Sequence, residues 1–153
     1  PGSSVEIQHA QLFFAVGHIS IKMLTYIENL KIKLMKLSIQ KRRITMKGME
    51  IEAKDKDEDL AQITGGHEAE LEQYKQIIQN ITEDKLIQEG YLGKFVPKIV
   101  KICQMTLQRN QRRQESSPEV IVLERIAVLS LCKIMCVSSK TCAENLDLVF
   151  KIL

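Results

Sequence analysis

The sequence predicts an all-α protein built from successive antiparallel helix pairs. Among 153 residues there are only seven glycines, three prolines and no tryptophan, which disfavours a turn-rich β fold. Apolar residues recur at the helical spacing of three or four along most of the chain. Polar links, some containing proline, separate the apolar runs at intervals that suit helices of about 15 to 20 residues.

Composition indicates an ordinary globular chain. Hydrophobic residues make up 44% and charged residues 27%, and a net charge of +3 is too small to imply nucleic-acid binding by itself. No stretch of 18 uncharged apolar residues is present, so we expect no membrane-spanning helix. The four cysteines do not have a recognised zinc spacing, and we expect buried, reduced thiols; they are Cys103, Cys132, Cys136 and Cys142.

Residues 5–45 are predicted to form a helical pair. A helical stripe with spacings of three and four runs through them and consists of Leu24, Ile27, Leu30, Leu34 and Leu37. Gly17 and Ser20 interrupt the run, so we expect one helix near residues 6–16 and a long basic helix over residues 19–44. Ser20 is the candidate N-cap of that second helix.

Residues 46–66 are acidic, lack an apolar stripe and end in Gly-Gly. A loop of this length in a compact domain is usually functional or disordered, and we interpret it as a disordered insertion. Residues 1–4 read as a cloning remnant, and the pattern at the end of the chain as that of a piece cut from a longer protein.

Residues 67–153 return to the helical period. Gly90 is a plausible helix stop, and the position of Pro97 predicts that a helix begins or bends near Phe95. Ser117 and Pro118 form a strong helix start, with the serine as N-cap and the proline in the first turn. The Ser-Pro pair also fits a proline-directed phosphorylation site, although capping is enough to explain it.

Helix pairs that recur every forty or so residues suggest an α-solenoid of HEAT or armadillo type, carrying one disordered acidic insertion. In such a fold each pair is covered by its neighbours. This explains why residues 12–26 are apolar on most sides, since other helices would flank them. Cut solenoid ends expose apolar surface, so we expect a risk of self-association that does not reflect a native assembly.

Enzymatic chemistry is not indicated. The glycines near residue 65 lack the lysine and hydroxyl residue of a phosphate loop, and the three histidines lie far apart in sequence. We therefore expect no catalytic residue, metal, cofactor or small-molecule substrate. A four-helix-bundle enzyme with a carboxylate metal site would need Glu-x-x-His on two helices, and none is present.

The distribution of charge indicates more about function than the catalytic motifs do. Between Lys22 and Lys47 there are eight basic residues and a single acid, Glu28. This run is either a solvated helix face or a patch that meets DNA phosphates or an acidic partner. On charge alone the best candidates for such contact are Lys36, Lys41, Arg42 and Arg43, followed by Arg109, Arg112 and Arg113.

Three segments in order resemble a known family. Residues 13–43 read FFAVGHISIKMLTYIENLKIKLMKLSIQKRR, residues 63–103 read ITGGHEAELEQYKQIIQNITEDKLIQEGYLGKFVPKIVKIC, and residues 124–153 read ERIAVLSLCKIMCVSSKTCAENLDLVFKIL. Together they resemble condensin complex subunit 1, the HEAT-repeat subunit of condensin that is not an SMC protein. The resemblance covers about Phe13 to Leu153. Ser20, where the family often has alanine, and a longer link before Ser117 depart from its pattern.

The resemblance implies a scaffold without catalytic activity that acts in mitotic chromosome condensation. Its implied partners are the kleisin and SMC subunits of condensin and the backbone of double-stranded DNA, and its implied location is the nucleus and chromosome, with a cytoplasmic pool. The alternative is a HEAT or armadillo adaptor for another nuclear interaction such as nuclear transport. Such an adaptor would be marked by regularly repeated Trp-Asn or acidic positions on its inner helices, and this chain has no tryptophan.

Overall fold

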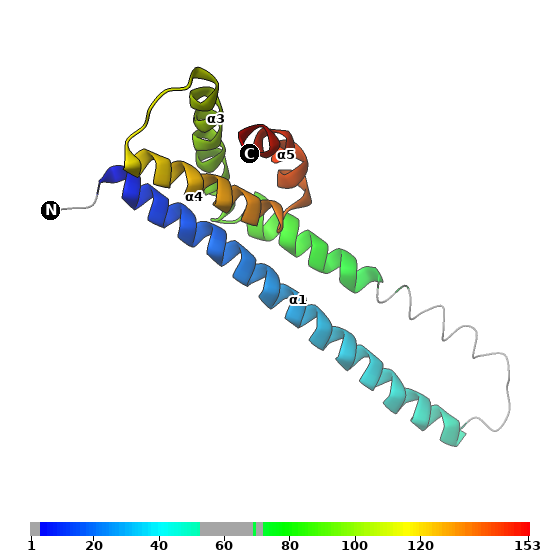
Figure 1. Ribbon diagram of the computed structural model, residues 1–153. Coiled ribbons are helices and arrows are strands. Elements are labelled where there is room, and N and C mark those ends of the chain that lie inside the picture. Colours follow the sequence, from blue (N-terminus) through cyan, green and yellow to red (C-terminus); the bar gives the residue numbers. More distant parts are fainter. Residues whose placement is uncertain (1–3, 53–68, 70–71) are drawn as a thin grey trace. The chain divides into compact units, whose positions relative to one another are not determined.

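The computed structural model describes residues 4–52, 69 and 72–153. Within that part of the chain every regular element is a helix and no strand occurs, which confirms the all-α prediction (Figure 1). The elements are α1 (Val5–Glu52), a helical run over residues 72–80, the π-helical η1 (Ile81–Gln88), the 3₁₀ turn η2 (Gly93–Phe95), α3 (Val96–Arg112), α4 (Pro118–Met135) and α5 (Ser139–Ile152). They divide into two units: residues 1–24 with 81–153, and residues 25–80.

The expected break at Gly17 and Ser20 is wrong, because α1 is one continuous helix from Val5 to Glu52. The Ser20 hydroxyl does not cap a helix. It donates to the Val16 carbonyl oxygen at 2.8 Å, one turn earlier in the same helix, and is fully buried. A serine whose hydroxyl returns to its own helix satisfies its polar group without ending the helix.

The acidic segment begins later than expected. Residues 46–52, assigned to the insertion from sequence, belong to the last turns of α1. Residues 53–68, for which the sequence predicts disorder, lie outside the part of the chain that the structure describes.

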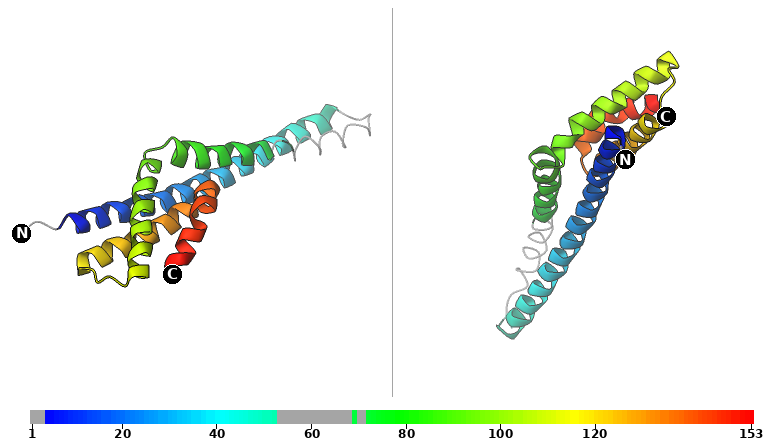
Figure 2. Two further views of the ribbon diagram at one scale, coloured as in Figure 1. Left: turned by 90° about the horizontal axis from the view of Figure 1, so that it is seen from above. Right: turned by 90° about the vertical axis from the view of Figure 1, so that its left-hand side faces the viewer.

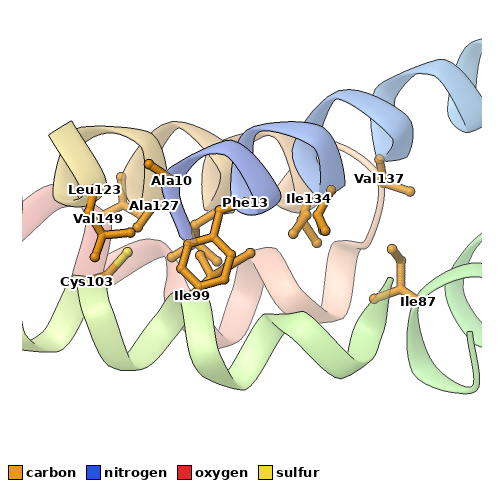
Figure 3. Close-up of a cluster of buried hydrophobic side chains, with 12 residues drawn as sticks. Ala10, Phe13, Ile87, Ile99, Cys103, Leu123, Ala127, Ile134, Val137 and Val149 are labelled. Carbon is orange, nitrogen blue, oxygen red and sulfur yellow. The ribbon is translucent and has the colours of Figure 1, made fainter. Parts of the chain in front are cut away.

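The first unit is built around one apolar core. Figure 3 shows Phe13 of α1 in one cluster with Ile99 and Cys103 of α3 and with Ala127 and Ile134 of α4. Further buried side chains of α1, η1, α4, α5 and the link between α4 and α5 complete the core, namely Ala10, Val16, Ile87, Leu123, Leu131, Val137 and Val149. Successive packing of α3, α4 and α5 on one another fits the α-solenoid prediction.

The start of α1 and α4 approach each other very closely. The two helices run side by side in the same direction in Figure 1, and both views of Figure 2 agree. A Cβ atom added at Gly17 would lie 2.9 Å from the Ser130 Cα atom, closer than real Cβ contacts. The missing side chain therefore permits this close contact between helices, which accounts for a glycine in the interior of a helix.

The starts of α3 and α4 follow the sequence prediction. Pro97 lies in the first turn of α3, and Pro118 is the first residue of α4, where a missing N–H is harmless. Ser117 occupies the N-cap position, but its side chain accepts no capping hydrogen bond. Gly90 lies at the C′ position of η1, which ends at Gln88, as the sequence predicts, but no described glycine has the positive φ of a left-handed cap. A Cβ at Gly90 would lie 2.1 Å from the Leu86 carbonyl oxygen, so tight backbone approach requires this glycine.

Glu83 of η1 ties the N-terminus of α5 in place. Its carboxylate accepts from the Ser138 hydroxyl at 2.8 Å, from the Ser139 backbone N–H at 2.6 Å and from the Ser139 hydroxyl. Ser138 in turn caps α5 by accepting from the Thr141 N–H at 3.1 Å. Burial favours a raised pKa for Glu83, but these hydrogen bonds outweigh it and lower the pKa below its ordinary value.

By length and composition, α1 could cross a membrane. The segment Val5–Lys41 contains a stretch of 18 residues whose mean hydropathy, 1.3, is high enough for a membrane span. One such helix is weak support for a membrane role, because a core helix passes the same test. The packing of Phe13 and Val16 into the core of the first unit accounts for part of its apolar character.

Candidate functional site

The basic residues predicted on α1 do not share one side of the helix. Lys36 and Arg43 are seven residues apart and therefore lie on the same side, and both are exposed. Lys41 is exposed on a different side. The backbone of Arg42 is helical, but its side chain lies outside what the structure describes. The run of four cations is thus distributed around the helix, with Lys36 and Arg43 forming its clearest pair.

A shallow groove lies beside Lys36. It has a volume of about 340 Å³ and is lined by Tyr26, Asn29, Leu30, Ile32, Lys33 and Lys36, all on α1 within the second unit. Two ammonium groups border an apolar and aromatic floor there. Sequence reasoning chose Lys36 on charge alone and missed Lys33 and Tyr26; the seven-residue recurrence of exposed apolar residues along this helix is the signal that could have found them.

Arg109 is engaged inside the fold. Its guanidinium forms an ion pair with the Glu124 carboxylate of α4, and the two side chains are only 19% and 12% exposed. A paired guanidinium this deeply placed serves helix packing better than it serves an external phosphate. The pair therefore removes Arg109 from the surface cations.

Arg112 and Arg113 remain at the surface. Both are exposed at the C-terminal end of α3, where positive charge interacts favourably with the helix dipole. Arg113 is the C-cap and has left-handed backbone angles, with φ 51° and ψ 39°. Its N–H donates to the Asn110 carbonyl oxygen at 3.3 Å. These two side chains form a small basic group on the first unit.

The Arg109–Glu124 pair borders a second, larger groove of about 810 Å³ between α3, α4 and the end of α5. Ile121, Leu129 and Ile152 give it apolar walls.

The cysteines are free, but not all are buried as expected. Cys103 is buried, Cys132 and Cys142 are half-buried, and Cys136 is exposed. Burial raises the pKa of Cys103 to about 12 and also raises that of Cys132, which disfavours the nucleophilic thiolate form of both side chains. Within the described residues no group of three His, Cys, Asp or Glu side chains could hold a metal ion.

Comparison with known proteins gives a consistent result. The chain is 29% identical to condensin complex subunit 1 of Saccharomyces cerevisiae over 99% of its own length, which is 13% of that protein. It is also 29% identical to condensin complex subunit 1 of Schizosaccharomyces pombe over 97% of its length and 12% of that protein. The resemblance to condensin complex subunit 1 is confirmed.

The similarity to condensin complex subunit 1 extends across both units of the structure, since it covers nearly all of the chain. The chain spans about an eighth of the length of these curated relatives. No protein-family model matches the chain.

Proposed function

We propose that this chain is a HEAT-repeat scaffold segment of the condensin complex that supports mitotic chromosome condensation. The observation that carries the proposal is the similarity to condensin complex subunit 1 over 99% of the chain. The packed helices of the first unit supply the rigid framework that a scaffold needs. Its partners are the kleisin subunit and the SMC heads, it acts in the nucleus and on chromosomes, and it performs no catalytic step of its own.

Exchange of the matching segment tests this role. Residues 5–153 would replace the aligned segment of condensin complex subunit 1 in Saccharomyces cerevisiae, and the other condensin subunits would be measured by co-immunoprecipitation. We expect the chimeric subunit to retain them, whereas a subunit with the segment deleted loses part or all of that association. A chimera that is expressed at the normal level yet retains no more than the deletion would refute the scaffold role. An adaptor for nuclear transport, the alternative, predicts that outcome.

We also propose that Arg112 and Arg113 contact the backbone of double-stranded DNA. Both are exposed cations at the end of one helix, and neither has an acidic partner among the interactions that the structure describes. Such contacts hold DNA without reading its sequence and weaken as salt rises. Of the basic residues predicted on α1, Lys36 and Arg43 share one side of the helix and form the second basic group, which contacts DNA or an acidic partner.

Titration with non-specific double-stranded DNA at two salt concentrations tests the DNA contact. We expect Arg112,Arg113→Ala to weaken binding and to reduce the salt slope by about two, because each arginine neutralises about one phosphate. Exposed Lys151, which pairs with Asp147 at 2.5 Å, provides the control substitution Lys151→Ala. An equal decrease in the control and in the double variant would indicate a diffuse charge effect instead of a site.

A further inference from the structure

On α1, the second unit exposes a regular apolar stripe. Leu30, Leu37 and Ile44 follow one another at intervals of seven residues, and Tyr26 lies on the same side of the helix. Their exposed fractions are 38%, 59%, 66% and, for Tyr26, 58%. Exposed large apolar side chains that gather on one side of an element and are rimmed by polar residues mark interaction sites in soluble proteins.

The stripe is separate from the face of α1 that the fold already uses. Ile27 and Ser38 are buried on this part of the helix, at 7% and 8% exposure, while Leu37, directly before Ser38, is mostly exposed. The helix therefore has one covered face and one uncovered apolar row beside it. The row is not an extension of the core.

The spacing indicates the shape of what would cover it. A repeat of seven residues on a continuous helix keeps the row straight against a second helix wound around it. In heptad terms Leu30, Leu37 and Ile44 are at position a, and Tyr26 and Lys33 are at position d. In such pairs a side chain of one helix enters a hole between four residues of the other.

The groove of about 340 Å³ lies where such a hole would be. Tyr26, Asn29, Leu30 and Lys33 are successive d, g, a and d positions, and all four line the groove. These are the positions that form a hole in a two-helix coiled coil. The groove is therefore preformed to receive one apolar side chain from a neighbouring helix.

The positive charges beside the row indicate that the helix binding there carries acidic residues. Lys36 and Arg43 flank the row at successive g positions, and Lys33 lies within it. Edge residues at e and g choose partners by charge, so glutamates or aspartates on the facing edge would pair with these cations. A second copy of this chain would bring the same cations to the same edge and is disfavoured by repulsion.

We propose that the apolar stripe of α1, Tyr26, Leu30, Leu37 and Ile44, is the docking site for an amphipathic helix of a partner protein with acidic residues along its edge. The phosphates of DNA could pair with the cations, but they would leave the apolar row in water. The stripe therefore favours a protein partner over a nucleic acid. The inference deepens the proposed scaffold function by naming the chemistry of one partner. The docking proposal rests on the geometry of α1. Because peptide binding and the segment exchange in yeast are separate experiments, the docking site and the scaffold role can be refuted independently.

The test uses a labelled synthetic peptide of about four heptads, with leucine or isoleucine at a and d and glutamate at e and g. Its binding to the full chain would be measured by fluorescence anisotropy, and its folding by circular dichroism. We expect binding that weakens with added salt and induces helix in the peptide. The same peptide with lysine at e and g should not bind, because it would face Lys36 and Arg43.

Variants locate the site. Leu30→Ser and Leu37→Ser, at exposed positions of the stripe, should each weaken peptide binding about tenfold while the helical content of the protein is unchanged. Ile39→Ser provides the matched control, since Ile39 is 40% exposed on the opposite side of the helix, and binding should stay within about twofold. Lys36,Arg43→Ala should weaken binding and remove most of its salt dependence.

Several results would overturn the proposal. These are failure of the acidic peptide to bind the unmodified chain, or equal binding by Leu37→Ser and Ile39→Ser. Binding of non-specific double-stranded DNA or anionic lipid vesicles that disappears in Leu37→Ser would assign the stripe to those ligands instead. Self-association that Leu37→Ser abolishes would make a second copy the occupant.

Discussion

At the scale of single residues, the structure separates charges that support the fold from charges that face outward. Arg109 and Arg112 are both cations of α3, yet only Arg112 is exposed. The sequence of α4 contains the clue that Arg109 is buried in an ion pair. Glu124 lies beside Leu123 and Ala127 on the buried, apolar face of α4, where a carboxylate requires a partner. Reading α3 alone could not show that, because an ion pair is a property of two helices.

Breaking the Arg109–Glu124 pair should destabilise the chain. We expect Arg109→Ala to lower the free energy of unfolding by about 2–4 kcal/mol, because Glu124 would be left with little solvent and no cation. Urea unfolding measures the change. Replacing both residues with apolar side chains, Arg109→Met with Glu124→Leu, should recover most of the decrease. If the double variant is as unstable as the single one, the pair contributes through more than its charges.

The Glu83 carboxylate should make stability depend on pH. Glu83→Gln removes charged hydrogen bonds at the start of α5 and should lower the unfolding free energy by about 1 kcal/mol at neutral pH, since solvent screens part of their strength. Because folding lowers the pKa of Glu83, its contribution is present above the ordinary glutamate value of about 4.3 and is lost as pH falls through the lower folded value.

Urea midpoints of both proteins between about pH 7 and pH 3 measure this effect. The difference between them should shrink as the pH falls. A difference that stays constant across this range would mean that the ionised carboxylate is not what holds α5.

At the scale of elements, helix type and the starts at Pro97 and Pro118 followed from local sequence, because proline geometry acts within one turn. The continuity of α1 did not. Glycine and serine weaken an isolated helix. Here Gly17 leaves room for Ser130 of α4 to pack against α1, and the Ser20 hydroxyl donates to a carbonyl oxygen of its own helix. Tertiary packing overrides local propensity at both positions. Likewise, the groove on α1 could not be found from charge, since it depends on which apolar residues stay uncovered.

Adding a side chain at Gly17 should separate α1 from α4. Alanine has the better helix propensity by about 1 kcal/mol, so a solvent-exposed glycine would gain stability from this change. At Gly17 the new Cβ would meet the Ser130 backbone at 2.9 Å, and we expect Gly17→Ala to destabilise by about 1–3 kcal/mol instead. Thermal unfolding beside the exposed control Gln11→Ala measures the effect, and a stabilised Gly17→Ala would show that the two helices can part without cost.

At the scale of the whole molecule, the chain combines one packed unit with a second unit whose long helix carries an uncovered apolar row. The fold class was readable from periodicity, and the resemblance to condensin complex subunit 1 from three segments in order. The partners were not, since they depend on surfaces that residue types alone do not define. Arg112 and Arg113 belong to the first unit, and Lys36 and Arg43 to the second, so the exposed basic residues fall into two groups.

The scaffold role is tested most directly by gel filtration of the purified chain with a reconstituted subcomplex of the SMC and kleisin subunits of condensin. Condensin complex subunit 1 of Saccharomyces cerevisiae serves as the positive control. The account predicts that the chain co-elutes with the subcomplex at micromolar concentration. If the positive control co-elutes while the folded chain runs alone even at about tenfold higher concentration, the chain does not act as a condensin scaffold segment.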